Sequence, residues 1–163
     1  MKPPARAKRR VRSKPEVIAV IVEDSRWKKP LVALARRAAA AALAHTKSKG
    51  TLTILLTSDA RLRELNHDFR GKDLATNVLS FPARDEKNYL GDIAIGYGIC
   101  VREAKAAGKT LAHHTAHLAV HGVLHLLGHD HEKPRQADTM EALEARILAT
   151  LGIADPYAAR EAA

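Results

Sequence analysis

Cysteine is nearly absent from this chain, and long apolar runs are absent too. Cys100 is the single cysteine among 163 residues, so no disulfide can form within the chain. The most continuous apolar run near the N-terminus, residues 17–22, is too short for the apolar region of a signal peptide. It is also too short to cross a bilayer. We therefore expect a cytoplasmic protein that does not bind membranes.

The first fourteen residues contain seven Lys and Arg residues and no acidic residue. They carry +7 of the formal net charge of +9, so the rest of the chain carries only +2. Two prolines and the lack of apolar periodicity predict that residues 1–15 form a disordered basic arm. The arm is either a solubilising extension or a segment that touches a polyanion such as ribosomal RNA, because Lys and Arg supply most sequence-independent affinity for phosphates. Its cations are Lys2, Arg6, Lys8, Arg9, Arg10, Arg12 and Lys14.

Short β-branched runs fall mainly in the first half of the chain, and helical patterns dominate the second half. This order predicts an α+β fold, a small mixed four-stranded sheet with helices packed on one face. We expect the first strand to be buried on both faces, and residues 82–88 to form either a hairpin loop or a flexible flap between the last two strands. The expected strands cover residues 17–22, 51–56, 77–81 and 92–95, and the expected helices cover 29–44, 60–67, 99–107, 110–127 and 135–151.

Residues that begin and end helices support these boundaries. Asp59 is placed to cap the N-terminus of the second helix, while Gly108, Gly128 and Gly152 stand where glycine commonly ends a helix. The apolar content suits one core of ordinary depth. We therefore predict a single domain over residues 16–155, followed by a frayed tail over residues 156–163.

Histidines are concentrated between residues 113 and 131. His121 and His125 are four residues apart, so on a helix their rings project from one face. Gly128 can adopt the left-handed conformation that ends the helix, which lets the chain turn back and bring His131 to the same point. Three imidazoles with a fourth position open are typical of a catalytic zinc site. The sequence therefore predicts one Zn²⁺ ion bound by these three histidines; the alternative is that they are ordinary surface or core histidines.

Residues near the predicted site have weaker assignments. His117 lies on the same helix face one turn earlier, where it would orient a ligand, face the substrate or simply be exposed. Asp130 is placed to orient a ligand imidazole. Met140 and Ile147 belong to an apolar stripe on the last helix, which we interpret as a packing surface.

Four sequence motifs are residues 65–73 (LNHDFRGKD), 76–82 (TNVLSFP), 90–93 (LGDI) and 121–131 (HGVLHLLGHDH). Together they resemble the YbeY family of bacterial rRNA maturation factors. The resemblance extends over roughly residues 60 to 150, and residues 1–16 lie outside it. It implies a single-strand-specific, zinc-dependent endoribonuclease that acts in small-subunit rRNA maturation and ribosome quality control. It also implies that the partners are ribosomal RNA and the small ribosomal subunit rather than DNA.

Carried over residue by residue, the resemblance makes His121, His125 and His131 the zinc ligands and places Arg70 in the active-site cleft. Arg70 would then meet the negative charge that develops on a phosphoryl group during phosphodiester hydrolysis. One departure from the family pattern is visible, because His129 stands where the family usually has tyrosine. This substitution adds a competing candidate ligand.

Two other functions stay open on the sequence alone. The spacing H-x-x-x-H-x-x-G-x-x-H is that of the metzincin zinc proteases, but these place a glutamate directly after the first histidine, where this chain has Gly122. A metalloprotease would therefore lack its usual base. The other alternative is a ribosome-associated RNA-binding factor in which zinc has a structural role.

Overall fold

The computed structural model describes residues 17–70, 76–84, 86–130 and 132–158, with the side chain of Arg70 outside the description. Two predictions, the basic arm and the position of His131, therefore lie outside the described residues. The elements follow each other in the order β1 (Ile18–Val22), α2 (Lys29–His45), β2 (Thr51–Thr57), α3 (Asp59–Arg70), β3 (Val78–Pro82), β4 (Tyr89–Gly96), α4 (Tyr97–Ala106), α5 (Leu111–Leu126) and α6 (Pro134–Thr150).

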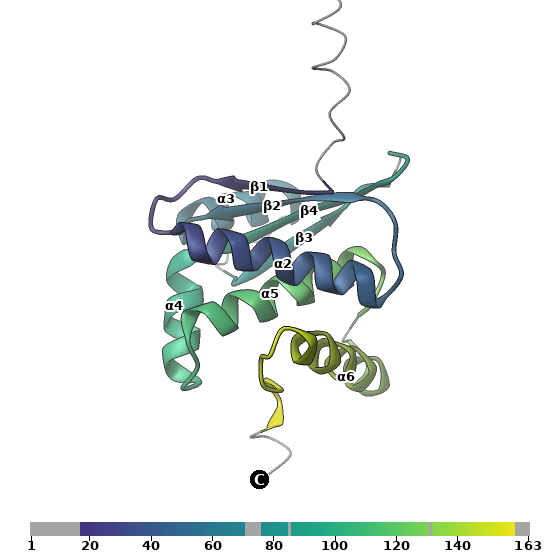
Figure 1. Ribbon diagram of the computed structural model, residues 1–163. Coiled ribbons are helices and arrows are strands. Elements are labelled where there is room, and N and C mark those ends of the chain that lie inside the picture. The colour runs from purple at the N-terminus through teal and green to yellow at the C-terminus, as the bar shows by residue number, and fades with distance from the viewer. Residues whose placement is uncertain (1–16, 71–75, 85, 131, 159–163) are drawn as a thin grey trace, which may run out of the picture.

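The four strands form one mixed sheet in the order β1-β2-β4-β3. Strands β1, β2 and β4 are parallel, and β3 returns antiparallel to β4 as the predicted hairpin. Helices α2 and α5 lie side by side against one face of this sheet, and α6 lies beyond them (Figure 1). The predicted α+β class and mixed four-stranded sheet are confirmed.

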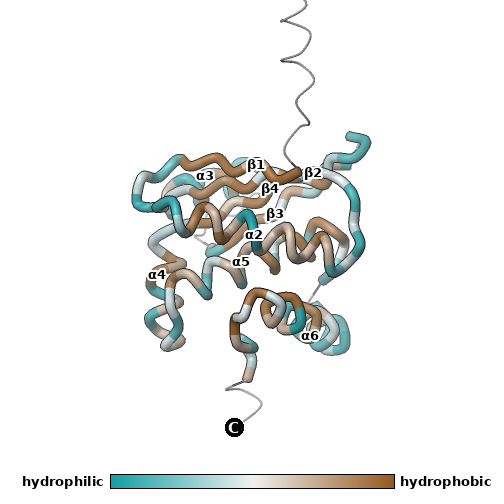
Figure 2. Tube along the Cα trace, in the orientation of Figure 1, coloured by the Kyte–Doolittle hydropathy of each residue, from teal (hydrophilic) through white to brown (hydrophobic). Residues whose placement is uncertain are grey.

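The larger core lies between the sheet and the helix pair α2 and α5. Fully buried side chains of β2 and β4, among them Ile54 and Ile93, face the helices. The buried stripe of α2 consists largely of alanine, which allows its backbone to approach α5 closely. Apolar residues accordingly follow the strands and the inward stripes of the helices, while polar residues follow the connections (Figure 2). This core holds α5 rigidly in place.

Helix α3 is the exception to the expected packing of helices on one face. Its Leu62 and Leu65 form a second apolar cluster with Leu79 of β3 and Ala94 of β4, separate from the larger core. Because neighbouring residues of a strand point to opposite faces, Ala94 faces α3 while Ile93 faces α5. The sheet is therefore covered by helices on both faces, although α3 covers less of it.

The expectation that the first strand is buried on both faces is wrong. In the described part of the chain, strand β1 is an edge strand whose one partner is β2, and the side chains of Ile21 and Val22 are 52% and 43% exposed. A short apolar run is compatible with either an edge or a central strand, because its residues do not specify how many partner strands will lie beside it.

The predicted cap of α3 is corrected. Ser58, not Asp59, caps α3, because its hydroxyl accepts the backbone N–H of Arg61 at 3.2 Å. The frayed tail stays a prediction; of its described residues, Pro156 accepts a hydrogen bond at its carbonyl from Lys109 Nζ at 2.9 Å. Within the described residues, no helix combines the length and apolarity needed to cross a membrane.

The thiol of Cys100 is expected to be inert in the folded protein. The side chain is fully buried on α4, and burial raises the pKa of the thiol to about 11. Because the thiolate is the reactive form, we expect no reaction with an aromatic disulfide reagent under native conditions and one equivalent after unfolding in guanidinium. Rapid labelling of the native protein would show that this part of the core opens readily.

Candidate metal centre

Helix α5 carries the central histidines of the predicted site. Its first turn is capped by Thr110, whose hydroxyl accepts the backbone N–H of His113 at 3.0 Å. Its apolar side chains, including Val120 and Leu124, are buried in the larger core. This packing fixes the orientation of the helix. His121 and His125 project from the side of α5 that faces away from the core, where both are partly exposed.

The C-terminal end of α5 confirms the predicted turn at Gly128. The backbone N–H of His129 donates to the carbonyl of Leu124 at 3.0 Å, and that of Gly128 donates to the carbonyl of His125 at 3.0 Å. This pair of hydrogen bonds, with Gly128 at a φ of 95°, is the Schellman arrangement that ends a helix. The chain therefore doubles back immediately after the two histidines.

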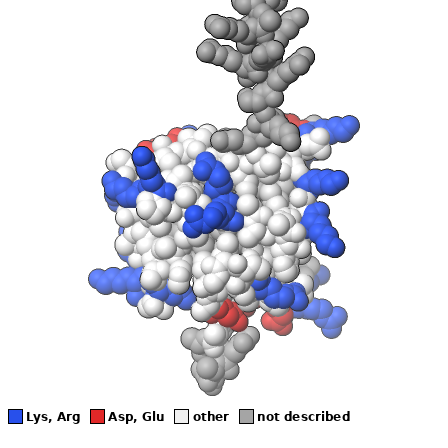
Figure 3. Space-filling model, viewed as in Figure 1, with Lys and Arg blue, Asp and Glu red and all other residues white. Residues whose placement is uncertain are grey.

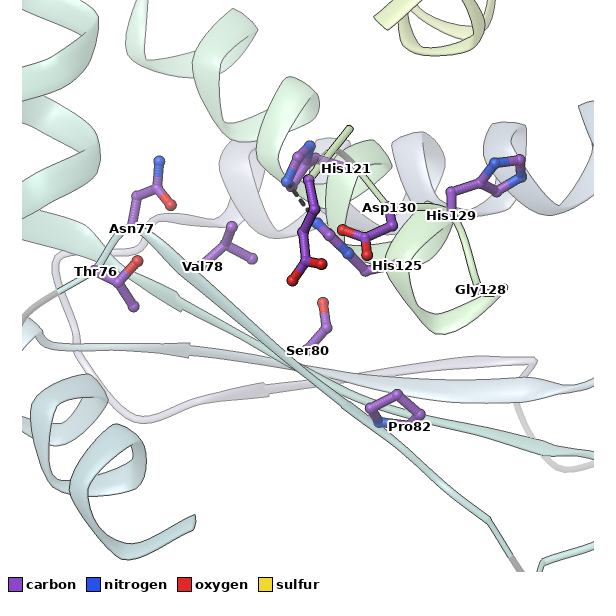
Figure 4. A pocket seen from close by; sticks show the side chains of 11 residues that line it. Thr76, Asn77, Val78, Ser80, Pro82, His121, His125, Gly128, His129 and Asp130 are labelled. Atoms are coloured by element: carbon purple, nitrogen blue, oxygen red, sulfur yellow. Dashed lines mark hydrogen bonds between the residues drawn. The ribbon is translucent and has the colours of Figure 1, made fainter. Parts of the chain in front are cut away.

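The rings of His121 and His125 converge on one point. Their Nε2 atoms are 3.0 Å apart, and Figure 4 shows the two nitrogens facing each other across the top of a cavity. On one tetrahedral zinc ion, two imidazole nitrogens would be separated by about 3.3 Å. The pair therefore fits two coordination positions of a single metal ion after a shift of a few tenths of an ångström.

A buried carboxylate from α6 fixes the ring of His121. The Nδ1–H of His121 donates to Oε1 of Glu144 at 2.6 Å, which makes Nε2 the nitrogen whose lone pair can bind a metal ion. The side chain of Glu144 is only 1% exposed. A carboxylate in this position holds a metal-binding imidazole in the tautomer and orientation that it needs.

Glu144 has further partners that keep it ionised. His117 Nε2 donates to Oε2 of Glu144 at 2.8 Å, and the hydroxyl of Tyr157 donates to the same oxygen. Burial by itself raises the pKa of Glu144, but the hydrogen bonds from His117 and His121 outweigh it and lower the pKa to about 2. Of the three roles considered for His117, orientation of a ligand is the one that its contacts support, because it reaches His121 through Glu144.

A cavity of about 600 Å³ opens below the histidine pair. Most of its lining comes from the strand β3 segment and from the turn that follows α5. Figure 4 shows Ser80 and Asp130 near the pair, while the ring of His129 is directed away from it. His129 is thus not placed as a competing ligand, and the orienting role of Asp130 stays a prediction. The lining residues are Thr76, Asn77, Val78, Ser80, Pro82, His121, His125, Gly128, His129, Asp130 and Glu132.

The structure brings two of the four predicted site residues together, His121 and His125. The other two, His131 and the side chain of Arg70, lie outside the described residues, although the backbone of Arg70 ends helix α3. Glu144 and Tyr157 are not among the site residues predicted from the sequence. For Glu144 a signal was present, because an acidic residue interrupts the buried stripe of α6 between Met140 and Ile147. For Tyr157 we find no such signal.

Close packing explains why glycine follows His121. A Cβ atom on Gly122 would lie 2.8 Å from Cγ2 of Ile93 on β4, and the carbonyl of Gly122 accepts a hydrogen bond from the hydroxyl of Ser80 at 3.2 Å. The helix that bears His121 and His125 is therefore seated directly on the sheet at this point. A glutamate at position 122 would not fit without moving the helix or the strand.

We expect Gly122→Ala to destabilise the protein by about 1–3 kcal/mol, because overpacking outweighs the higher helix propensity of alanine. Urea unfolding would measure the change. As a matched test, Gly122→Ala is also introduced into a protein that carries Ile93→Ala. That background lacks the methyl groups that clash, so Gly122→Ala should lower the free energy of unfolding by less there. An equal cost in both backgrounds would show that Ile93 is not the reason for the glycine.

The amino-acid sequence of this chain matches one family of known proteins. The family profile described as Endoribonuclease YbeY matches residues 18–152. A protein of that description from Chelativorans sp. (strain BNC1) is 52% identical over 133 residues, which cover 77% of this chain and 82% of the relative. One from Nitrobacter winogradskyi is 46% identical and covers 97% of this chain and 94% of the relative.

The fold agrees with a solved structure. The solution structure of TM1509 from Thermotoga maritima matches with a TM-score of 0.58 and 24% sequence identity, over 82% of this chain and 91% of that one. A helix that presents paired imidazoles beside a buried carboxylate defines a candidate metal-binding protein of α+β fold. The chain belongs to the Endoribonuclease YbeY family.

Proposed function

We propose that this protein is a single-strand-specific, zinc-dependent endoribonuclease that acts in the maturation of small-subunit ribosomal RNA and in ribosome quality control in the cytoplasm. The observation that carries the proposal is the convergence of His121 and His125 above a polar cavity, with His121 held by buried Glu144. The endoribonuclease description of its relatives supports the reaction class. The ribosomal RNA substrate and the small subunit as partner come from the family resemblance.

The residues have distinct roles in this proposal. His121, His125 and His131 would hold one zinc ion, and Glu144, which binds Nδ1 of His121, would leave Nε2 of that ring for the metal. A zinc ion bound in such a site supplies an activated water at neutral pH and polarises a phosphoryl oxygen. The polar side chains of Ser80 and Asn77 line the cavity where the RNA backbone would lie.

Arg70 would stabilise the negative charge that builds up on the phosphoryl group, as an arginine fork pairs well with two phosphoryl oxygens. Helix α3, which ends at Arg70, packs against β3 and β4, and β3 contributes to the cavity. We therefore expect Arg70→Ala to lower the rate of RNA cleavage without changing the metal content. A loss of metal in this variant would mean that Arg70 supports the fold of the site rather than the reaction.

The metalloprotease alternative is disfavoured by the packing of α5. Those proteases need a carboxylate directly after the first histidine, and here the side chain of Ile93 occupies the space that a side chain at Gly122 would need. Among the described residues, Asp130 and Glu132 line the cavity and offer carboxylates in other positions. Digestion of casein by the zinc-loaded protein would revive the protease assignment.

The proposed function is tested with a fluorescent single-stranded RNA and its duplex form. Metal-stripped protein should be inactive, and one equivalent of Zn²⁺ should restore cleavage of the single strand in preference to the duplex. If the restored protein contains stoichiometric zinc and still binds RNA but does not cut it, the alternative of an RNA-binding factor with structural zinc is favoured. If neither metal nor RNA is bound, both assignments fail.

A further inference from the structure

A second RNA contact is suggested by the outer surface of α2, away from the metal centre. Between Asp24 and Asp59 the sequence contains no acidic residue at all. Helix α2 and the residues at its two ends fall within this stretch. We call its six exposed cations the α2 basic face: Lys28, Lys29, Arg36, Arg37, Lys47 and Lys49.

No acidic side chain of the described residues neutralises the α2 basic face. Among the described residues, none of its six cations forms an ion pair. By contrast, nearby Arg26 is bound to Asp24 at 2.7 Å, and we therefore leave it out of the face. Figure 3 shows blue side chains over the part of the surface where α2 lies, with red atoms only near the margins. These cations are available to a polyanion.

The helix geometry arranges the charges in a row. Lys29 precedes the adjacent pair Arg36 and Arg37 by seven and eight residues, so the three cations lie on one broad side of α2. The exposed positions beyond them include Ala40 and Ala44, whose small side chains let a ligand approach closely. The helix rises about 12 Å from Lys29 to Arg37, and Lys47 and Lys49 lie beyond its C-terminal end, so the cations together can follow several consecutive phosphates.

Helix α2 is the neighbour of the helix that carries the histidine pair. It packs along α5 through its buried side, so its cations lie on the outer side, one helix away from His121 and His125. Arg36 Nε also donates to the carbonyl of Ile18 at 3.4 Å, so the face adjoins the start of β1.

We propose that the α2 basic face binds the sugar–phosphate backbone of the RNA substrate beyond the cleaved bond. This inference rests on the proposed function for the choice of RNA among polyanions. An anionic membrane fits the surface less well, because membrane-bound helices insert large apolar side chains beside their cations and the exposed stripe here offers alanines. The contacts are sequence-independent and salt-sensitive.

The test compares the full-length protein with two charge-matched double variants. Arg36→Gln with Arg37→Gln removes two charges from the α2 basic face, and Lys105→Gln with Arg146→Gln removes two exposed charges from α4 and α6. Binding to a single-stranded RNA of about 30 nucleotides is measured by fluorescence anisotropy over a KCl series, with chelator present to prevent cleavage. Each lost phosphate contact should reduce the log–log slope by about 0.7, so the α2 variant should be shallower by about 1.4.

The control variant should keep a slope close to that of the unmodified protein. Equal slopes for all three proteins, or equal losses in the two variants, would overturn the proposal. A parallel titration with phosphatidylglycerol vesicles gives the third outcome: if the α2 variant loses vesicle binding and keeps its RNA slope, the face binds membranes instead. The proposed nuclease activity is measured separately. If the protein does not cleave RNA but the α2 variant shows a shallower salt slope, the nuclease proposal fails while RNA binding by the α2 basic face is supported.

Discussion

His125→Ala should remove stoichiometric metal from the purified protein and lower RNA cleavage by about three orders of magnitude. Its Nε2 atom lies 3.0 Å from Nε2 of His121, so truncation removes one of the two converging nitrogens. Because His125 is partly exposed and the core of α5 is formed by other residues, the fold should survive. Elemental analysis after dialysis and a cleavage assay with added zinc measure the two effects.

Two histidine controls make this result specific. His113→Ala removes an exposed imidazole from the same helix, and His129→Ala removes the ring that is directed away from the pair. Both variants should retain metal and activity. Cleavage that persists unchanged in His125→Ala would come from a contaminating nuclease or from chemistry that does not use this site. Metal loss in His129→Ala would place that residue among the ligands after all.

The local features of the site were predictable from the sequence because they depend on neighbours along the chain. The four-residue spacing of His121 and His125 and the position of Gly128 are sufficient to predict a shared helix face followed by a turn. Both predictions are confirmed. The same holds for the β3–β4 hairpin, whose strands are joined by a short polar connection.

Features that depend on contacts between distant segments were not predictable. Glu144 reaches His121 across 23 positions, and nothing in the spacing of either helix specifies how they are oriented towards each other. The exposure of Ile21 likewise follows from the absence of a partner strand outside β1 in the described sheet. The cap of α3 is a further example. The carboxylate of Asp59 accepts the backbone N–H of distant Ile99 at 2.9 Å, and Ser58 caps the helix in its place.

Glu144→Gln should weaken metal binding by about 10- to 100-fold, the usual cost of losing a carboxylate that orients a ligand imidazole. Glutamine has nearly the same shape but only one accepting oxygen, whereas the carboxylate of Glu144 accepts hydrogen bonds from His117, His121 and Tyr157. At least one of these donors would lose its acceptor. Competition with a chelating dye measures the metal affinity on the folded variant.

Stability separates the orienting role of Glu144 from a merely structural one. Glu144→Ala should cost about 3–5 kcal/mol in the metal-free protein, because it leaves buried donors without their carboxylate. Tyr157→Phe removes one donor and keeps the carboxylate, so it should reduce metal affinity less than Glu144→Gln does. If Glu144→Gln binds zinc as tightly as the unmodified protein while its unfolding midpoint falls, the carboxylate stabilises the packing of α5 against α6 and does not tune the metal site.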